Sequence, residues 1–146
     1  MWLGAAGVSA AVHFDVQHNF ILLASGSKRY TLLPPAAHHR LQLHPRWHGS
    51  RRQAQLHLPT IAPGVEEEAI VVTLRSGDAL YLPPLWFHYV ETLSPTVSVN
   101  FWTDSLFSDV WIYLTDRQQW GELLADSDSG RRVTDARLDR KSVVYP

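Results

Sequence analysis

Short hydrophobic runs separated by turn residues are the dominant pattern of this chain. The runs are rich in Val, Ile, Leu and aromatic residues, and they are short enough to be single strands. The pattern predicts β-strands at residues 20–23, 29–33, 53–57, 69–74, 79–82 and 96–102. The last of these alternates polar and apolar side chains, so we expect Thr96, Ser98, Asn100 and Trp102 to share one face. A polar face of this kind suggests an internal cavity.

Turn residues punctuate the predicted strands. Ser25-Gly26-Ser27 lies between the first two runs, and we interpret it as a hairpin turn. Pro34 and Pro35 end the second run because proline cannot donate a hydrogen bond to a ladder. A further turn is predicted at residues 75–78, Arg-Ser-Gly-Asp.

The hydrophobic period changes after Trp102. Apolar residues then recur at helical spacing through residues 107–124, and Asp104 is a plausible N-cap of that helix. We therefore expect a β domain over residues 1–104, a helical segment over 105–125 and a polar, mobile tail over 126–146. Because strands do not alternate with helices, the sequence predicts an all-β sandwich or barrel with a C-terminal helix.

Composition narrows the classes of function. The 146 residues suffice for one domain, and a net charge of −1 gives no global attraction to nucleic acid or to an anionic membrane. The apolar residues 2–12 lack a basic leader and are too short to span a bilayer, so we interpret them as strand and loop. With no cysteine, any metal must bind nitrogen and oxygen ligands. The same absence is compatible with a reducing compartment, cytoplasmic or nuclear, without demanding one.

The sharpest chemical feature is the pair His13 and Asp15. Two residues apart on a strand, their side chains share a face and could bind one metal ion. His88, which follows an apolar run, is the best candidate for a third ligand. Two imidazoles and one carboxylate form the facial set of non-haem Fe(II) oxygenases. The ordinary alternatives are a core histidine and an exposed turn carboxylate.

The surrounding motifs resemble those of the JmjC, or cupin-like, 2-oxoglutarate oxygenases, and the resemblance runs in order over residues 2–102. It looks closest to the factor-inhibiting-HIF type of asparaginyl hydroxylase, because His44-Pro45, His48 and residues 52–55 also resemble an insert of that branch. The motifs are Trp2-Leu3-Gly4, His13-Phe14-Asp15, Asn19, Gly26-Ser27-Lys28-Arg29, Pro34-Pro35, Gly77-Asp78-Ala79-Leu80-Tyr81-Leu82-Pro83, Trp86-Phe87-His88 and Asn100-Phe101-Trp102.

The resemblance implies a double-stranded β-helix, or jelly roll, with His13, Asp15 and His88 as Fe(II) ligands. It implies 2-oxoglutarate as cosubstrate and O2 as oxidant. In this family a lysine pairs with the distal carboxylate of the cosubstrate, and Lys28 stands at that motif position. Asn19 and Asn100 match amides near the metal-bound end of the cosubstrate, and Trp102 matches an aromatic wall. Without the resemblance, Lys28 after a turn would be interpreted as a solvated charge.

The resemblance also implies a protein or peptide substrate. Gln17, Arg52 and Gln53 match positions that hold the target asparagine and its backbone, although a solvated loop is an alternative for Arg52 and Gln53. Hydroxylation of asparagine is therefore the first expectation, with lysine, arginine, histidine or modified tRNA as alternative targets. A non-catalytic, cupin-like module that binds metal or peptide is the alternative from another class. The apolar stripe over residues 107–124 is expected either to cover the core or to form a dimer contact, and related enzymes dimerise through helices after the jelly roll, so a homodimer through the C-terminal helix is one expectation.

Two departures from the family pattern concern the cosubstrate pocket. The related hydroxylases have a threonine three residues before the first metal histidine, where this chain has Ala10. Ser9 could replace that threonine only if the strand bulges. The family's pocket tyrosine precedes the Trp-Leu-Gly motif, and this chain starts at Met1, so we expect a more open pocket or a truncated domain.

Overall fold

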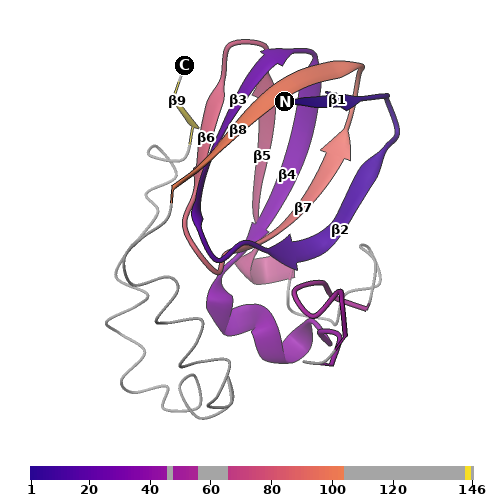
Figure 1. Ribbon diagram of the computed structural model, residues 1–146, viewed down its shortest axis with the longest axis vertical. Helices are drawn as coiled ribbons and strands as arrows, with labels where there is room; N and C mark the ends of the chain where they lie inside the picture. The colour runs from indigo at the N-terminus through magenta and orange to yellow at the C-terminus, as the bar shows by residue number, and fades with distance from the viewer. Residues whose placement is uncertain (46–47, 56–65, 104–143, 146) are drawn as a thin grey trace.

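Two antiparallel β-sheets face one another in the computed structural model (Figure 1). The structure describes residues 1–45, 48–55, 66–103 and 144–145. One sheet, here called sheet A, has the order β1-β8-β3-β6-β9, and sheet B has the order β2-β7-β4-β5. The strands are β1 (Trp2–Gly4), β2 (Ser9–Phe14), β3 (His18–Ser25), β4 (Ser27–Leu33), β5 (Ile70–Arg75), β6 (Ala79–Leu82), β7 (Phe87–Thr92), β8 (Thr96–Thr103) and β9 (Val144–Tyr145). Two short 3-10 helices, η1 (Pro35–Arg40) and η2 (Glu66–Glu68), complete the described elements.

This arrangement confirms the predicted all-β, cupin-like jelly roll. Five of the six predicted strands are present as β3, β4, β5, β6 and β8, with their bounds moved by a few residues. The exception is the run at 53–57, where Gln53 and Ala54 make only isolated bridges and residues 56–57 lie outside the described part of the chain. The hydrophobic runs predicted neither β7 nor η1, since β7 is interrupted by polar His88 and Glu91 and η1 follows a proline pair.

The turn at Gly26 is not a hairpin, contrary to the sequence interpretation. β3 pairs with β6 and β8, whereas β4 pairs with β5 and β7, so the chain crosses from sheet A to sheet B at this point. Gly26 has φ +86°, and a Cβ built on it would lie 2.1 Å from the carbonyl oxygen of Pro95. The position requires glycine for its backbone conformation and for the close approach. The predicted stop at Pro34 and turn at Gly77 are both confirmed, since β4 ends at Leu33 and Gly77 has φ +95°.

Two hydrophobic clusters hold the sheets together. One lies between the sheets, and its most deeply buried members include Leu23, Leu32 and Leu74. The other joins β2 and β7 to η1 through Val12, Phe87 and buried residues that include Ala37 and Leu41. Each fully buried Leu or Phe side chain contributes about 1.5–3 kcal/mol relative to an exposed one. Part of the space between the sheets is not filled by these clusters and forms a pocket.

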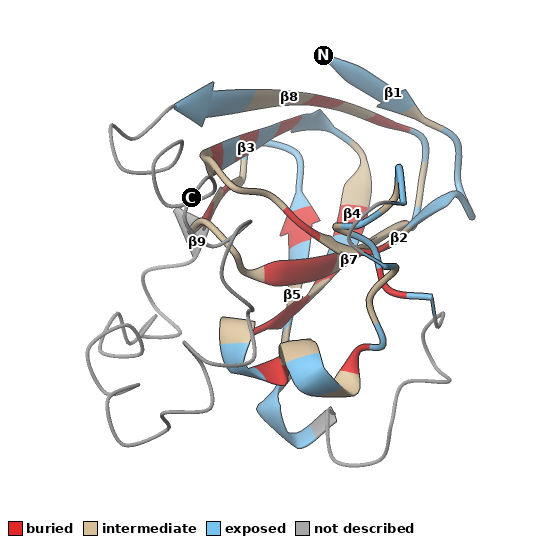
Figure 2. Ribbon diagram, turned by 60° about the horizontal axis from the view of Figure 1, so that its bottom comes forward, coloured by how far each residue is buried: buried red, intermediate tan, exposed pale blue. Residues whose placement is uncertain are grey.

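The alternation predicted for residues 96–102 is confirmed. Thr96 and Ser98 are buried, while Val97 and Val99, which alternate with them, are only half-buried, and β8 is banded by burial in Figure 2. The polar face of β8 therefore turns inward, and the apolar face turns outward, which is the reverse of an ordinary solvent-facing strand.

The predicted C-terminal helix over 105–125, its N-cap at Asp104 and residues 126–143 of the predicted tail lie outside the described residues. Within the tail, Val144–Tyr145 form β9 at the edge of sheet A beside β6. Among the residues that the structure describes, no helix has the length and apolar character needed to cross a bilayer.

Candidate functional site

His13 and His88 face each other across β2 and β7. They are direct partners in the strand register, and their ring centroids are 4.1 Å apart. The register shifts between Ala10 and His13, because β2 advances three residues while β7 advances two, from Val90 to His88. This β-bulge turns both Ala10 and His13 toward the interior. The structure thus brings the two histidines together, as the sequence predicted.

Both imidazoles have a defined proton position. The Nδ1 atom of His13 lies 2.7 Å from the carbonyl oxygen of Ala11, and the Nδ1 atom of His88 lies 3.2 Å from that of Trp86. A carbonyl oxygen only accepts, so each Nδ1 must donate its hydrogen, and in the neutral rings each Nε2 keeps a free lone pair. An Nδ1–H bonded to a backbone carbonyl is the usual support of a metal-binding histidine.

His88 is held in its neutral form. The residue is only 4% exposed, and burial together with the nearby His13 lowers the pKa of His88 to about 4. The neutral imidazole is the form that binds a metal ion. His88 therefore needs no deprotonation before it could act as a ligand near neutral pH.

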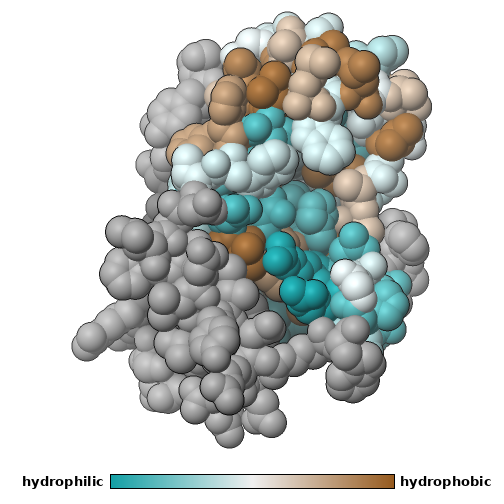
Figure 3. All heavy atoms as spheres, in the orientation of Figure 1, coloured by the Kyte–Doolittle hydropathy of each residue, from teal (hydrophilic) through white to brown (hydrophobic). Residues whose placement is uncertain are grey.

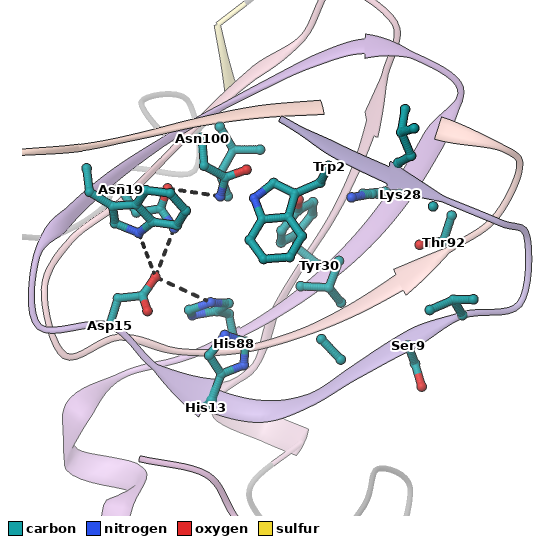
Figure 4. Close-up of a pocket in the computed structure, with 17 residues that line it drawn as sticks. Trp2, Ser9, His13, Asp15, Asn19, Lys28, Tyr30, His88, Thr92 and Asn100 are labelled. Carbon is teal, nitrogen blue, oxygen red and sulfur yellow. Dashed lines mark hydrogen bonds and ion pairs between the residues drawn. The ribbon is translucent and has the colours of Figure 1, made fainter. Parts of the chain in front are cut away.

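Asp15 stands in the loop just after β2, so its place beside His13 comes from the loop and not from strand alternation. Its Oδ2 atom accepts hydrogen bonds from Asn19 Nδ2 at 2.9 Å and from Trp102 Nε1 at 3.3 Å (Figure 4). Asn19 in turn accepts a hydrogen bond at 3.2 Å from Asn100 Nδ2. A hydrogen-bond network from β3 and β8 of sheet A, of which Asn19 is the buried member, thus orients a carboxylate toward the histidines of sheet B.

The main chain also fixes Asp15. Its carbonyl oxygen accepts a 2.7 Å hydrogen bond from the amide of Leu85, in the loop between β6 and β7. Leu85 has φ +67°, a conformation that costs a branched residue about 1–2 kcal/mol. That strained loop leads directly into the strand that carries His88, so the two candidate ligand segments are tied together.

Two imidazoles and a carboxylate, from His13, His88 and Asp15, suit a divalent transition metal. In this structure the donor atoms of His88 and Asp15 are farther apart than two ligands of one ion would be. His88 Nε2 and Asp15 Oδ2 are 4.0 Å apart. Neighbouring ligands of an octahedral ion with bonds of about 2.1 Å are separated by about 3 Å. Accordingly, the described residues contain no cluster of three or more such side chains already gathered as a metal site. A shift of about 1 Å in the Asp15 carboxylate would bring it to ligand spacing from His88, and the chemistry of the three donors fits a metal ion.

A pocket of about 440 Å³ opens between the sheets beside these residues, and Lys28 lies at its opposite end from Asp15 (Figure 4). Lys28 is 9% exposed, and its Nζ atom donates a 3.0 Å hydrogen bond to Ser98 Oγ. Burial lowers the pKa of Lys28 below its usual 10.5. No ion pair of Lys28 occurs within the described ranges, so this buried ammonium faces the pocket without a carboxylate partner.

Several residues that line the pocket were not singled out as site residues by the sequence. Trp2 of β1 and Tyr30 of β4 border it together with Thr92 of β7, whose position in the register is opposite Lys28. Burial raises the pKa of Tyr30, which keeps its hydroxyl protonated. Tyr30 could have been found from the sequence, because residues 28 and 30 of one strand share a face.

Ala10 stands where the related hydroxylases have a threonine, and Ser9 was expected to replace that threonine only if β2 bulges. β2 does bulge, yet Ala10 pairs with Val90, which lines the pocket, whereas Ser9 pairs with Glu91 and its hydroxyl is directed away from Lys28 in Figure 4. The hydroxyls placed near Lys28 belong instead to Ser98 and, across the register, Thr92.

A second, more polar cavity of about 290 Å³ adjoins His13 and Asp15. Arg51, Arg52 and Gln53 line it, and the amide of Phe14 donates to the Arg52 carbonyl at 3.2 Å. The segment is thereby attached to β2 beside the candidate metal ligands. Gln17, the third residue of the expected substrate-binding group, is half-buried in the loop before β3 and is not among the residues that line either cavity.

Taken as geometry, these features define an all-β jelly-roll domain with a histidine and carboxylate group at the mouth of a pocket that holds a buried lysine. Residues 1–109 match the family described as "Cupin-like domain". The chain belongs to this cupin-like family.

The chain is also similar to proteins with jumonji C names. It is 36% identical over 105 residues to Jumonji C domain-containing protein 5 of Drosophila melanogaster, and the matched region covers 69% of this chain and 26% of that protein. It is 32% identical over 111 residues to the lysine-specific demethylase JMJ31 of Arabidopsis thaliana, covering 71% and 20%. It is 29% identical over 127 residues to the human bifunctional peptidase and (3S)-lysyl hydroxylase JMJD7, covering 70% and 40%. The chain therefore spans well under half the length of these relatives.

Proposed function

We propose that this chain is an Fe(II)- and 2-oxoglutarate-dependent oxygenase domain that hydroxylates a protein side chain. The observation that carries the proposal is the convergence of His13, His88 and Asp15 at one end of a pocket whose other end holds the buried Lys28, which forms no ion pair with the described residues. A dicarboxylate with one chelating end and one free end matches this arrangement of donors and charge. The jumonji C relatives, whose names include a demethylase and a hydroxylase, support the same class.

In this proposal the two histidines and Asp15 hold Fe(II). Bound iron would couple the oxidative decarboxylation of 2-oxoglutarate to hydroxylation, with one oxygen atom of O2 passing to succinate and the other to the substrate. Lys28 would neutralise the distal carboxylate, with hydroxyl groups of Ser98, Thr92 and Tyr30 near it. Asn19, Asn100 and Trp102 would orient Asp15 and line the metal end of the pocket.

The second cavity is proposed as the place of the substrate. It shares His13 and Asp15 with the first pocket, so a side chain inserted there would reach the metal site. Arg52 and Gln53 offer donors for a backbone carbonyl or a side-chain amide, which favours asparagine as the target. Lysine is the second candidate, because the names of two of the relatives refer to lysine.

The experiment is an assay of succinate formation from labelled 2-oxoglutarate, with Fe(II) and candidate peptides, on the full chain. We expect Fe(II)-dependent turnover that His13→Ala abolishes and His39→Ala leaves unchanged, since His39 is an exposed histidine on η1 outside both cavities. Metal binding without decarboxylation would favour the non-catalytic, cupin-like module. Unchanged turnover in His13→Ala would refute the proposed ligand set.

A further inference from the structure

The outer face of sheet A is mainly apolar, and its polar outward positions on β3 and β8 are His18 and Thr103, which pair at one end of the strands. In the register, Phe20 lies between Phe101 and Tyr81, and Leu22 lies between Val99 and Ala79. Leu3 of β1 continues the same face beside Val97. None of the outward positions described on β1, β3, β6 and β8 is Asp, Glu, Lys or Arg. Leu3, Phe20, Leu22 and Phe101 are between 40% and 75% exposed.

Sheet B provides an internal comparison. Its outer face carries Arg29 and Glu91, which form a two-pronged ion pair at 2.7 and 3.0 Å, and the exposed Thr73 and Arg75 stand on the neighbouring strand. Apart from the exposed Val71, that face is polar and charged, whereas the described outward positions of sheet A carry no Asp, Glu, Lys or Arg. In Figure 3 the hydrophobic surface gathers toward the top of the view, where β1 and β8 lie in Figure 1, and hydrophilic residues predominate below. Contiguous apolar surface of this kind marks a contact surface.

The connection between β8 and β9 starts and ends on this same sheet. β8 ends at Thr103, which pairs with His18 of β3, and β9 begins at Val144, which pairs with Leu80 of β6. β3 separates β8 from β6, and Leu80 pairs with Ile21, three residues along β3 from His18, so the two ends lie three strand spacings apart across the sheet and about 10 Å apart along it, or about 17 Å in all. The described chain therefore leaves sheet A at Thr103 and rejoins it at Val144.

The sequence between β8 and β9 contains apolar residues that could pack on the outer face of sheet A. It contains seven large apolar residues at near-helical spacing: Phe107, Val110, Trp111, Leu114, Trp120, Leu123 and Leu124. A helix over residues 107–124 would be about 27 Å long at 1.5 Å per residue. The eight residues of β3 or of β8 also extend about 27 Å at 3.4 Å per residue. One helix of this length would cover the face along the full length of its strands.

We propose that residues 104–143 dock on the outer face of sheet A of their own chain, with the apolar residues of 107–124 packed against Phe20, Leu22 and Phe101. The docking is intramolecular because both ends of the segment are attached to the sheet it covers. It also links the segment to the site, since Trp102, which bonds Asp15, precedes it by two residues.

The test uses single cysteines, because the chain has none of its own. Leu22→Cys places a thiol on the outer face of sheet A, and Thr73→Cys places the matched control on the outer face of sheet B. We expect the Leu22→Cys thiol in the folded full chain to react with a fluorescent maleimide at least 10-fold more slowly than the control, at any protein concentration. Replacing Phe107, Trp111 and Leu114 together by serine should abolish the difference.

A second measurement does not depend on polar substitutions. Leu22→Cys is combined with one cysteine at position 107, 110, 111 or 114, and mild oxidation should form a disulfide within the monomer for at least one pair. Equal maleimide rates at both positions without any intramolecular disulfide would overturn the proposal. Protection that disappears on dilution, with disulfide-linked dimers, would also overturn it and assign the face to a second copy of the chain.

Discussion

His13 and His88 stand opposite each other in the β2–β7 register with ring centroids 4.1 Å apart, and each directs its Nδ1 toward a main-chain carbonyl. Because both Nε2 lone pairs are then available, a divalent cation should stabilise the fold. At a Mn(II) concentration 100 times its Kd, binding to the folded state alone adds about 2.7 kcal/mol. For a chain of this size that is about 5–10 °C in Tm.

Thermal unfolding with and without Mn(II) checks this expectation. His13→Ala and His88→Gln should remove the metal-induced shift in Tm, and His39→Ala should retain it. If both pocket variants keep the full shift, the metal is bound elsewhere in the chain.

Changing the residues that donate hydrogen bonds to Asp15 should affect the free energy of unfolding and the affinity for metal to different extents. Trp102 is 43% exposed, so Trp102→Phe should change the free energy of unfolding by less than about 0.5 kcal/mol. It nevertheless removes a donor to Asp15 Oδ2, and loss of such a supporting hydrogen bond weakens metal binding about 10–100-fold. Titration of Mn(II) by calorimetry measures the affinity.

Asn19→Ala is the contrasting change. Asn19 is buried and connects Asp15 to Asn100, so its loss should cost about 2–3 kcal/mol of stability as well as metal affinity. Should Trp102→Phe bind Mn(II) as tightly as the unmodified chain, the indole has no role in orienting the carboxylate.

The turn at Gly26, where the chain crosses from sheet A to sheet B, can be tested by comparing Gly26 with Gly7, which has nearly the same φ. Gly26 and Gly7 have φ of +86° and +82°, but a Cβ at Gly26 would meet the Pro95 carbonyl at 2.1 Å, whereas nothing lies within 4 Å at Gly7. Gly7→Ala should therefore cost only the conformational penalty of about 1–2 kcal/mol. Gly26→Ala should cost at least about 3 kcal/mol, because the backbone must also move. Urea unfolding of both variants decides the point, and equal losses would contradict the crossing geometry.

The sequence predicted more of the candidate site than of the connections between strands. The polar face of residues 96–102 is a local pattern that the structure confirms, whereas Asp15 lies beside the histidines through the loop after β2, which strand spacing did not predict. The bulge that turns Ala10 inward depends on pairing with β7, a strand that the hydrophobic runs did not predict. The crossing at Gly26 likewise depends on which distant strands pair with β3 and β4, and a turn sequence alone does not encode this.

Lys28 provides a prediction about ligand binding. Its buried ammonium has a hydroxyl partner in Ser98 and, in the described ranges, no ion pair, so Lys28→Met should raise the stability of the unliganded chain by about 1 kcal/mol near pH 7. The same change should weaken 2-oxoglutarate binding about 100-fold or more, because a buried carboxylate would lose its counter-charge. Calorimetry with Mn(II) present measures the affinity, and Arg29→Met, on the opposite face of β4, is the matched control.

The pH dependence of stability in the unmodified chain and in Lys28→Met tests whether the buried charge of Lys28 causes the difference between them. Burial lowers the pKa of Lys28 in the folded chain, so between that pKa and 10.5 the unfolded chain binds more protons than the folded chain. Stability then rises with pH over this interval. The stability deficit of the unmodified chain relative to Lys28→Met should be complete below the lowered pKa and should vanish as the pH approaches 10.5. Saturating 2-oxoglutarate should reverse the trend, because the bound carboxylate favours the charged ammonium. A deficit that stays constant across the alkaline range, measured by urea unfolding, would show that methionine acts through packing and that Lys28 is not a buried charge awaiting an anion.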